Sequence, residues 1–137
     1  MKFISVRGQL KDDKIVVELD RPCRCYIALA EFFIPVIDNK NSVENNVDIY
    51  CDQIDSSFLN PNRLLKRLIF NETKSTQTYN RFLANWFDFK LLDSQDKFLT
   101  LKIERTNGNQ MRFKNKKEIF LTLVMKSITD EDRWLRI

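Results

Sequence analysis

The side chains of this sequence that are best suited to chemistry are its closely spaced carboxylates. They form three groups: Asp12 with Asp13, Asp52 with Asp55, and the acidic run 130–132. Paired carboxylates perform acid–base chemistry in glycosidases and hold metal ions in nucleases. Each group here, however, lies where an apolar segment ends or a polar turn begins, and solvated aspartate is common at such places. We therefore interpret the three groups as turn residues rather than as catalytic pairs.

The rest of the composition excludes most of the common types of catalytic and cofactor-binding site. The chain has no histidine, which excludes histidine-activated serine and cysteine nucleophiles and histidine-bearing zinc sites. Its two glycines, Gly8 and Gly108, are too few for a phosphate-binding loop or a dinucleotide fingerprint. Its three cysteines, Cys23, Cys25 and Cys51, are fewer than the four ligands of a structural zinc site. We expect three reduced thiols, no metal, no cofactor and no enzymatic activity.

The length of the chain predicts a single domain, and the missing secretion signal predicts synthesis inside the cell. The 137 residues suit a single domain over 1–137, in which residues 127–137 form a C-terminal tail. The net charge of +4 favours weak attraction to polyanions without requiring it. No uncharged apolar run approaches the roughly 20 residues of a membrane-spanning helix, and the first residues lack the apolar core of a secretion signal. We therefore expect neither membrane insertion nor secretion through a signal peptide.

Short extended segments separated by polar turns recur along the whole chain. Such segments lie at 1–8, 14–20, 25–35, 46–54, 63–70, 79–92, 98–106, 111–113 and 118–126. The Asn107-Gly108 pair is typical of a tight hairpin turn. Eight or nine such strands predict an all-β fold, an antiparallel β-sandwich. One alternative is left open, because residues 61–70 also fit a helical turn that begins at Pro61.

Several of these segments carry apolar side chains on both faces, although a simple sandwich needs only one apolar face per strand. Segment 98–106 is one-sided, because Leu99, Leu101 and Ile103 alternate with polar residues. Segments 82–92 and 119–125 are apolar on both sides. So is segment 25–34, in which we expect one face to carry Ile27, Leu29 and Phe33 and the other to carry Tyr26, Ala28, Phe32 and Ile34.

The second apolar face must be covered, and an antiparallel sandwich has no helical layer to do so. A loop of the same chain or another chain has to provide the cover. We favour the second possibility and predict self-association, with cover by the chain's own loops as the alternative. The expected contact residues are Tyr26, Phe32, Trp86, Phe120 and, in the tail, Trp134.

Three stretches, CYIALAEFFIPVIDN, VDIYCDQIDSSFLNPNRLLKRLIF and FLTLKIERTNGNQMRFKNKKEIFLTLVMK, occur in this order. Together they resemble the single jelly-roll capsid proteins, penton or minor capsid proteins, of Maverick/Polinton elements and adintovirus-like viruses. The chain departs from that pattern at Lys66, where the pattern has arginine. The matching positions are Ala28, Leu29, Glu31, Pro35, Tyr50, Cys51, Asp52, Leu64, Leu65, Leu101, Ile103, Gly108 and Phe113.

The resemblance implies an eight-stranded jelly roll that serves as a penton or vertex subunit. Such a subunit would form a homo-oligomeric ring of five, pack against a major capsid protein, and reside in the virion after synthesis in the host cytoplasm. In a ring, each subunit presents one surface to a different surface of its neighbour. Charges between subunits would then fix the register, the candidates being Asp52, Asp55, Arg63, Lys66 and Arg67, although solvated strand ends explain the same residues.

Two other classes of function remain open. A binding module for nucleic acid or basic proteins would use the basic segment with an aromatic residue inside it, namely Arg112, Phe113, Lys114, Lys116 and Lys117. A solvated hairpin explains that segment equally well. A trimeric, cytokine-like jelly-roll ligand is the other possibility, although the missing secretion signal disfavours it.

Overall fold

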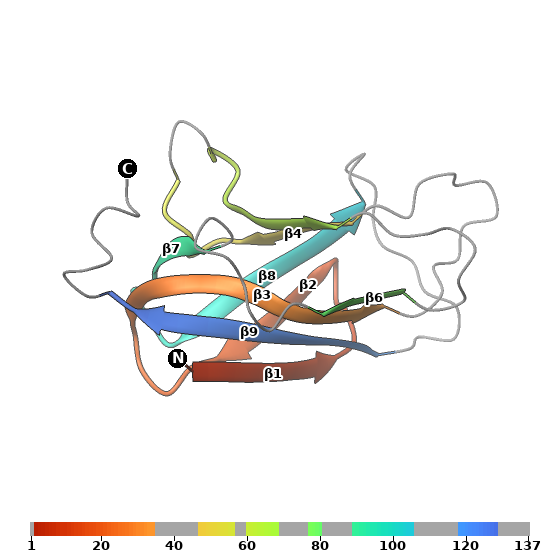
Figure 1. Ribbon diagram of the computed structural model, residues 1–137, viewed down its shortest axis with the longest axis horizontal. Coiled ribbons are helices and arrows are strands. Elements are labelled where there is room, and N and C mark those ends of the chain that lie inside the picture. The colour runs from red at the N-terminus through yellow and green to blue at the C-terminus, as the bar shows by residue number, and fades with distance from the viewer. Residues whose placement is uncertain are drawn as a thin grey trace.

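A computed structural model of the chain describes residues 2–34, 47–56, 60–68, 77–80, 89–105 and 118–128, with only the backbone described at 34, 77–80 and 105. These residues form nine β-strands and no helix (Figure 1). The strands are β1 Lys2–Gly8, β2 Lys14–Glu18, β3 Arg24–Ile34, β4 Val47–Cys51, β5 Leu64–Leu68, β6 Gln77–Asn80, β7 Lys90–Asp93, β8 Phe98–Arg105 and β9 Ile119–Ser127. The possible helical turn at 61–70 is wrong, because strand β5 occupies its centre.

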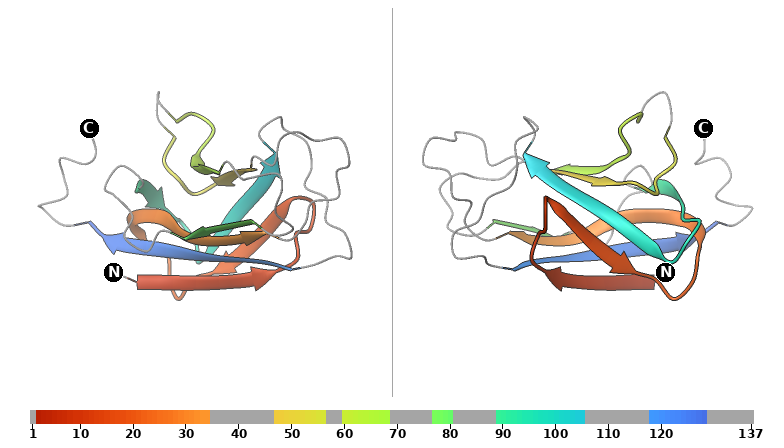
Figure 2. Two further views of the ribbon diagram at one scale, coloured as in Figure 1. Left: turned by 45° about the vertical axis from the view of Figure 1, so that its right-hand side comes forward. Right: turned by 180° about the vertical axis from the view of Figure 1, so that it is seen from behind.

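The strands form two antiparallel sheets that face each other (Figure 2). One sheet has the order β1-β9-β3-β6, with β7 also paired to β3, and the other has the order β2-β8-β4-β5. Strand β6 pairs with the end of β3, at Glu31–Ile34, and β7 pairs with its beginning, at Arg24–Ile27. Because both are antiparallel to β3 along the same edge, they form one interrupted row, and each sheet has four rows. The predicted antiparallel β-sandwich is confirmed.

The pairing of the rows is nested along the chain. The first row pairs with the last (β1 with β9), and the second with the second-last (β2 with β8). Next, β3 pairs with the row made of β6 and β7, and innermost, β4 pairs with β5. Two further pairings, β3 with β9 and β4 with β8, join these hairpins side by side into the sheets.

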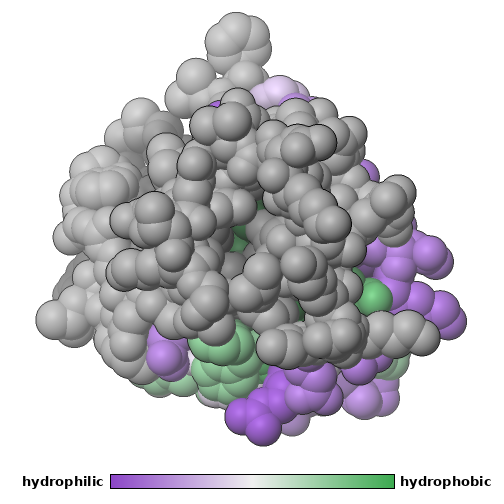
Figure 3. All heavy atoms as spheres, turned by 90° about the vertical axis from the view of Figure 1, so that its right-hand side faces the viewer, coloured by the Kyte–Doolittle hydropathy of each residue, from purple (hydrophilic) through white to green (hydrophobic). Residues whose placement is uncertain are grey.

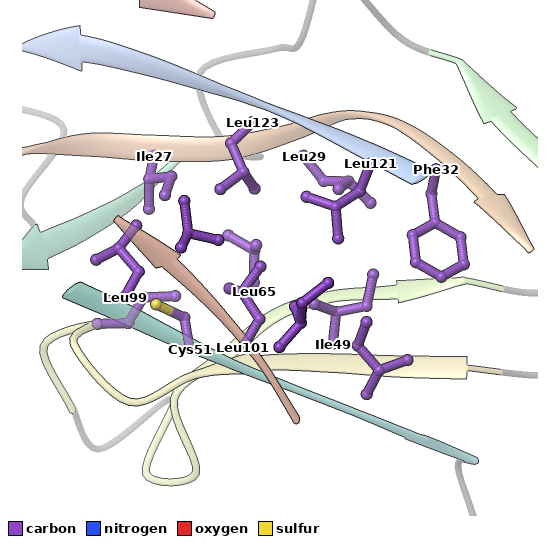
Figure 4. Close-up of a cluster of buried hydrophobic side chains, with 14 of the residues drawn as sticks. Ile27, Leu29, Phe32, Ile49, Cys51, Leu65, Leu99, Leu101, Leu121 and Leu123 are labelled. Carbon is purple, nitrogen blue, oxygen red and sulfur yellow. The ribbon is translucent and has the colours of Figure 1, made fainter. Parts of the chain in front are cut away.

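The main hydrophobic core fills the space between the sheets (Figure 4). Leu99, Leu101 and Ile103 of β8 point into it and are fully buried, as their alternation with polar residues predicts. From the opposite sheet, Leu121 and Leu123 of β9 point toward them. Alternation in the sequence therefore predicts correctly which side chains of β8 and β9 face the core.

Strand β3 departs from regular alternation, and this corrects one prediction. The pairing of β3 with β9 shifts register between Leu29 and Glu31, so that Ala30 is an extra residue on the β3 side. One extra residue reverses the faces of everything after it. Phe32 consequently points into the main core with 1% exposure, instead of outward, and Phe33 takes the outer position with 37% exposure.

The first carboxylate pair lies in a turn, as expected. Asp12 and Asp13 have positive φ angles of 53° and 66°. Lys11 and Lys14 on either side exchange two backbone hydrogen bonds of 3.0 Å. This is the geometry of a two-residue turn with both central residues in the left-handed region, which aspartate tolerates better than most residues.

Candidate assembly surface

The two outer faces of the sandwich differ in character. The outer face of the β2-β8-β4-β5 sheet is mainly polar, because β8 presents Thr100, Lys102 and Glu104 there, although Val16 of β2 and Phe98 of β8 are also exposed on it, at 59% and 41%. The ammonium of Lys102 lies 3.5 Å from the carboxylate of Glu104. Such a face suits contact with water.

Asp48 of β4 lies on this polar face and binds a neighbouring strand. Its carboxylate accepts hydrogen bonds from Arg67 of β5, at 2.7 Å from Nε and 3.0 Å from Nη2. The hydroxyl of Tyr50 donates a third hydrogen bond, at 3.3 Å. The ion pair with Asp48 raises the pKa of Arg67, and burial, followed by the nearby Asp48 charge, raises the pKa of Tyr50. Sequence analysis missed this network, because it depends on the register that places Asp48 opposite Arg67.

The outer face of the β1-β9-β3-β6 sheet is mainly apolar, and we call it the apolar outer face. It is defined by the outward-pointing residues Phe3, Ser5 and Arg7 of β1, Phe120, Thr122, Val124 and Lys126 of β9, Tyr26, Ala28, Ala30, Glu31 and Phe33 of β3, and Leu91 of β7. Near the β1 edge, apolar and charged surfaces of described residues lie side by side at one end of the molecule (Figure 3).

An aromatic row crosses one end of the apolar outer face. Phe120 lies directly opposite Arg7 on one side and Phe33 on the other. The guanidinium carbon of Arg7 lies 5.6 Å from the centre of the Phe120 ring, which is within cation–π distance. Phe120 is half-buried and Phe33 is 37% exposed. The row therefore offers aromatic surface, together with a positive charge, to a partner.

A polar row crosses the middle of the same face. The hydroxyls of Ser5 and Thr122 are hydrogen-bonded at 3.2 Å, and Thr122 donates to the carboxylate of Glu31 at 3.3 Å. All three residues are opposite one another in the pairing of β1, β9 and β3. Thr122 is only 3% exposed, so the polar groups of this row that a partner can contact are those of exposed Ser5 and half-buried Glu31. Polar groups beside apolar surface favour a partner whose own polar groups match them, and thus contribute specificity.

The chain itself covers part of the apolar outer face. Ala28, Ala30 and Val124 form a second buried cluster, and Phe89 packs against it. Tyr26, one of the expected contact residues, is only 3% exposed. The alternative of cover within the chain therefore applies to the centre of this face.

The exposed aromatic residues lie toward the edges of the face. Phe3 is 47% exposed and Phe33 is 37% exposed, and sequence analysis assigned neither to the contact surface. Alternation along 1–8 could have placed Phe3 on the outer face. Alternation alone could not have placed Phe33 there, because the bulge at Ala30 reverses the faces of the residues that follow it. Of the other expected contact residues, Phe120 lies on this face, Phe32 lies in the core, and Trp86 and Trp134 are outside the described residues.

Three of the five candidate register charges meet at one end of the sandwich. Asp52, Asp55 and Arg63 line a hollow of about 360 Å³, and so do Asp93 and Asp96. With four carboxylates and one guanidinium among these five side chains, the hollow is predominantly acidic. The remaining two candidates lie elsewhere: Arg67 binds Asp48, and Lys66 lies half-buried opposite the core residue Ile49.

Backbone hydrogen bonds fix the shape of this acidic hollow. The amide of Asp55 donates to the carbonyl of Leu91, and the amide of Asp93 donates to the carbonyl of Gln53, each at 2.9 Å. These bonds tie the end of β4, in one sheet, to β7 in the other. Arg63 enters the hollow from a left-handed backbone conformation with φ of 60°. These two hydrogen bonds therefore hold in place the segments that carry Asp52, Asp55 and Asp93.

The remaining candidate binding residues lie outside the described residues. The basic segment with Arg112, Phe113, Lys114, Lys116 and Lys117 is outside the described residues, as is the acidic run 130–132. Within the described part, no group of three histidine, cysteine, aspartate or glutamate side chains is placed to hold a metal ion. The same residues include no helix that is long and apolar enough to cross a membrane.

Comparison with known proteins adds no assignment to this geometry. No protein-family model matches the sequence, and no curated protein matches it.

Proposed function

We propose that this protein is a jelly-roll structural subunit that self-associates through its apolar outer face into a ring, as a capsid penton or vertex protein does. The observation that carries the proposal is the contrast between the two outer faces. A sandwich that works alone has mostly polar side chains on both outer faces. Here Phe3, Phe33 and Phe120 lie on one face beside a buried apolar cluster, whereas charged side chains predominate on the other face, where Phe98 and Val16 are the exposed large apolar residues.

The nested strand pairing supports the jelly-roll part of the proposal. A jelly roll can be described as one long hairpin of four strand pairs rolled into two facing sheets. That winding pairs the first row with the last and alternates the pairs between sheets. The pairs β1 with β9 and β3 with β6 and β7 lie in one sheet, and the pairs β2 with β8 and β4 with β5 lie in the other.

The exposed aromatic side chains support the self-association part. Phe3 and Phe33 together leave large parts of two rings in contact with water. At about 25 cal/mol per Å² of apolar area, covering the exposed part of each ring contributes about 2 kcal/mol. Such residues are typical centres of protein–protein interfaces, surrounded by polar contacts like the Ser5, Thr122 and Glu31 row.

The capsid part rests on the resemblance of the sequence to single jelly-roll proteins of Maverick/Polinton elements. In that role the ring, most simply a pentamer, would pack against a major capsid protein and belong to the virion. The acidic hollow gives the subunit a charged end distinct from its apolar face. A heterologous contact between neighbours, in which two different surfaces meet, needs two such distinct surfaces.

The oligomeric state of the purified protein tests the proposal. We expect light scattering at tens of micromolar to give several times the mass of one chain, and electron-microscope class averages to show five-fold rings. Replacing Phe33 by serine removes about 2 kcal/mol of apolar contact, so the dissociation constant should rise about thirtyfold.

Phe98 provides a matched control for this experiment. It is a phenylalanine of similar exposure, 41%, on the polar outer face of the other sheet. Phe98→Ser should therefore leave the oligomer unchanged. A wild-type protein that is monomeric at these concentrations, or equal effects of the two substitutions, would contradict the proposal.

A further inference from the structure

Two thiols lie close together at the start of β3. The sulfurs of Cys23 and Cys25 are 3.9 Å apart. Cys25 is 7% exposed and points toward the core, and Cys23 is half-buried beside it. All three cysteines of the chain are free thiols, and Cys51 lies apart, fully buried on β4.

A third sulfur-containing residue, Met125, borders the same space. Cys23, Cys25 and Met125 all line a cavity of about 400 Å³ at this end of the sandwich. Met125 of β9 pairs with Ile27, and Cys25 pairs with Ser127, so Met125 and Cys25 are diagonal neighbours on one face of the sheet. Diagonal neighbours of this kind are within reach of long side chains such as methionine. The cavity is thus lined by two cysteines at the start of β3 and by one methionine of the adjacent strand β9.

The separation of the thiols suits a shared metal ion better than a disulfide. A disulfide would need the sulfurs to approach to about 2.05 Å. The backbone resists this on both sides, because the carbonyl of Cys23 accepts a 2.9 Å hydrogen bond from the amide of Ser94 and Cys25 is paired to both β7 and β9. By contrast, two sulfurs that share one ion through bonds of about 2.3 Å lie about 3.8 to 4.0 Å apart.

The charged side chains that line the cavity carry a net charge of +1, because Asp20 lines it together with Lys2 and Arg21. Lys2 and Arg21 both line it, and the ammonium of Lys2 is 3.0 Å from the carboxylate of Asp20. Burial, with the neighbouring Cys23 as a smaller cause, raises the pKa of Cys25 to about 12.

We propose that Cys23, Cys25 and Met125 form a binding site for a soft monovalent cation, Cu(I). Thiolate and thioether ligands select Cu(I) among the biological metals, and three sulfurs are too few for structural zinc. Binding converts two thiols to thiolates and releases two protons, while the thioether donates a lone pair. No electron is transferred, so no oxidant or reductant is required. The inference is independent of the role in assembly.

Competition with a chromogenic Cu(I) chelator tests the site on the reduced full-length protein without oxygen. We expect one Cu(I) per chain. Cys23→Ser and Cys25→Ser should each weaken binding at least a hundredfold, and Met125→Leu, which keeps the volume, about tenfold. X-ray absorption at the copper edge should count three sulfurs in the wild-type protein and two in Met125→Leu.

Cys51→Ser is the matched control, because it removes a buried thiol that lies outside the cavity. It should leave the affinity for Cu(I) unchanged, and circular dichroism of each variant checks that the fold is retained. The proposal is overturned if the reduced protein yields all Cu(I) to the chelator, or if a folded Cys23→Ser variant binds as tightly as wild type. Equal losses in Cys51→Ser and Cys23→Ser would overturn it as well.

Discussion

The carboxylate of Asp48 is 1% exposed although it belongs to the outer face of its sheet. A buried charge is costly unless ionic and polar partners replace the water it loses. Arg67 supplies two hydrogen bonds and Tyr50 a third. Because Arg67 comes from the edge strand β5, this network fastens that edge to β4.

Substitution of Asp48 by asparagine should therefore destabilise the fold. The amide keeps the size of the side chain but loses the charge-assisted pair with Arg67, so we expect the free energy of unfolding to fall by about 1 to 2 kcal/mol. Urea denaturation measures it. The matched control is Glu18→Gln, which breaks the exposed 3.1 Å pair with Lys97 and should change stability by less than about 0.5 kcal/mol. Equal effects would contradict the structural role of Asp48.

Cys51 predicts a pH dependence of stability on the alkaline side. Burial raises its pKa to about 11, whereas a cysteine in an unfolded chain titrates near pH 8.5 to 9. Between about pH 9 and 11 the folded protein thus keeps a proton that the unfolded chain loses. The folded state binds more protons there, so this contribution to stability is complete below pH 9 and is lost as the pH rises.

A comparison of Cys51→Ala with wild type isolates this contribution. The substitution lowers stability at pH 8 through the lost packing, but the difference from wild type should shrink by about 2 kcal/mol at pH 10.5. Denaturant unfolding at the two pH values measures it. Leu65→Val, a change in the same core without an ionisable group, should show a constant difference. A constant difference for Cys51→Ala too would refute the assignment.

At the scale of single residues, alternation in the sequence was a reliable guide wherever a strand is regular. It correctly oriented Leu99, Leu101 and Ile103, and the polar stretch between two apolar segments correctly indicated the turn at Asp12 and Asp13. It could not find the pairing of Asp48 with Arg67, because that contact depends on which strands are neighbours and in what register. Alternation fixes the face on which a residue lies, but it does not distinguish two registers that differ by two residues.

At the scale of elements, the bulge in β3 decides which aromatic residue the sandwich buries. Ala30 is the extra residue, and it leaves the pairing of β3 with β9 in register on either side. With the bulge, Phe32 enters the core and Phe33 reaches the apolar outer face. A single residue thereby converts a mixed strand into one with a consistent inner face.

Deletion of Ala30 should be tolerated, because the remaining residues of β3 keep their partners. We expect a folded protein with stability reduced by about 1 to 2 kcal/mol, through loss of buried contacts in the second cluster. Deletion of Ala28 is the matched control. It removes the same side chain but turns Cys25 and Ile27 away from the core, so it should prevent folding. Circular dichroism and thermal unfolding distinguish the two. Similar behaviour of both deletions would contradict the bulge.

The sequence located the elements well and misjudged two of their details. The expected segment at 25–35 agrees with β3, yet regular alternation reversed the faces after the bulge. The segment expected at 79–92 corresponds to β6 and β7, which are separate strands in one row. Residues 81–88 between these two strands lie outside the described residues. The bulge leaves little signal in the local sequence, since the residues around it remain good strand formers.

At the scale of the whole molecule, the nested pairing brings together residues that are far apart in the chain. Ser5 and Thr122, for example, are hydrogen-bonded although 117 positions separate them. Strand patterns predicted two packed sheets but left the order of the strands undetermined. The difference between the two outer faces emerges only from that order, because it depends on which strands share a sheet.

The acidic hollow predicts how charge fixes the register of the proposed oligomer. Asp55 and Arg63 are both exposed and face the same space. If they form ion pairs across the contact between subunits, Asp55→Lys and Arg63→Glu should each weaken assembly about tenfold, and the double reversal should restore it. Light scattering over a range of concentrations measures this. As the matched control, reversal of the intramolecular Lys2 and Asp20 pair should have no effect on assembly. Additive losses in the double variant would show that the hollow is solvated and that the register is set by the apolar outer face alone.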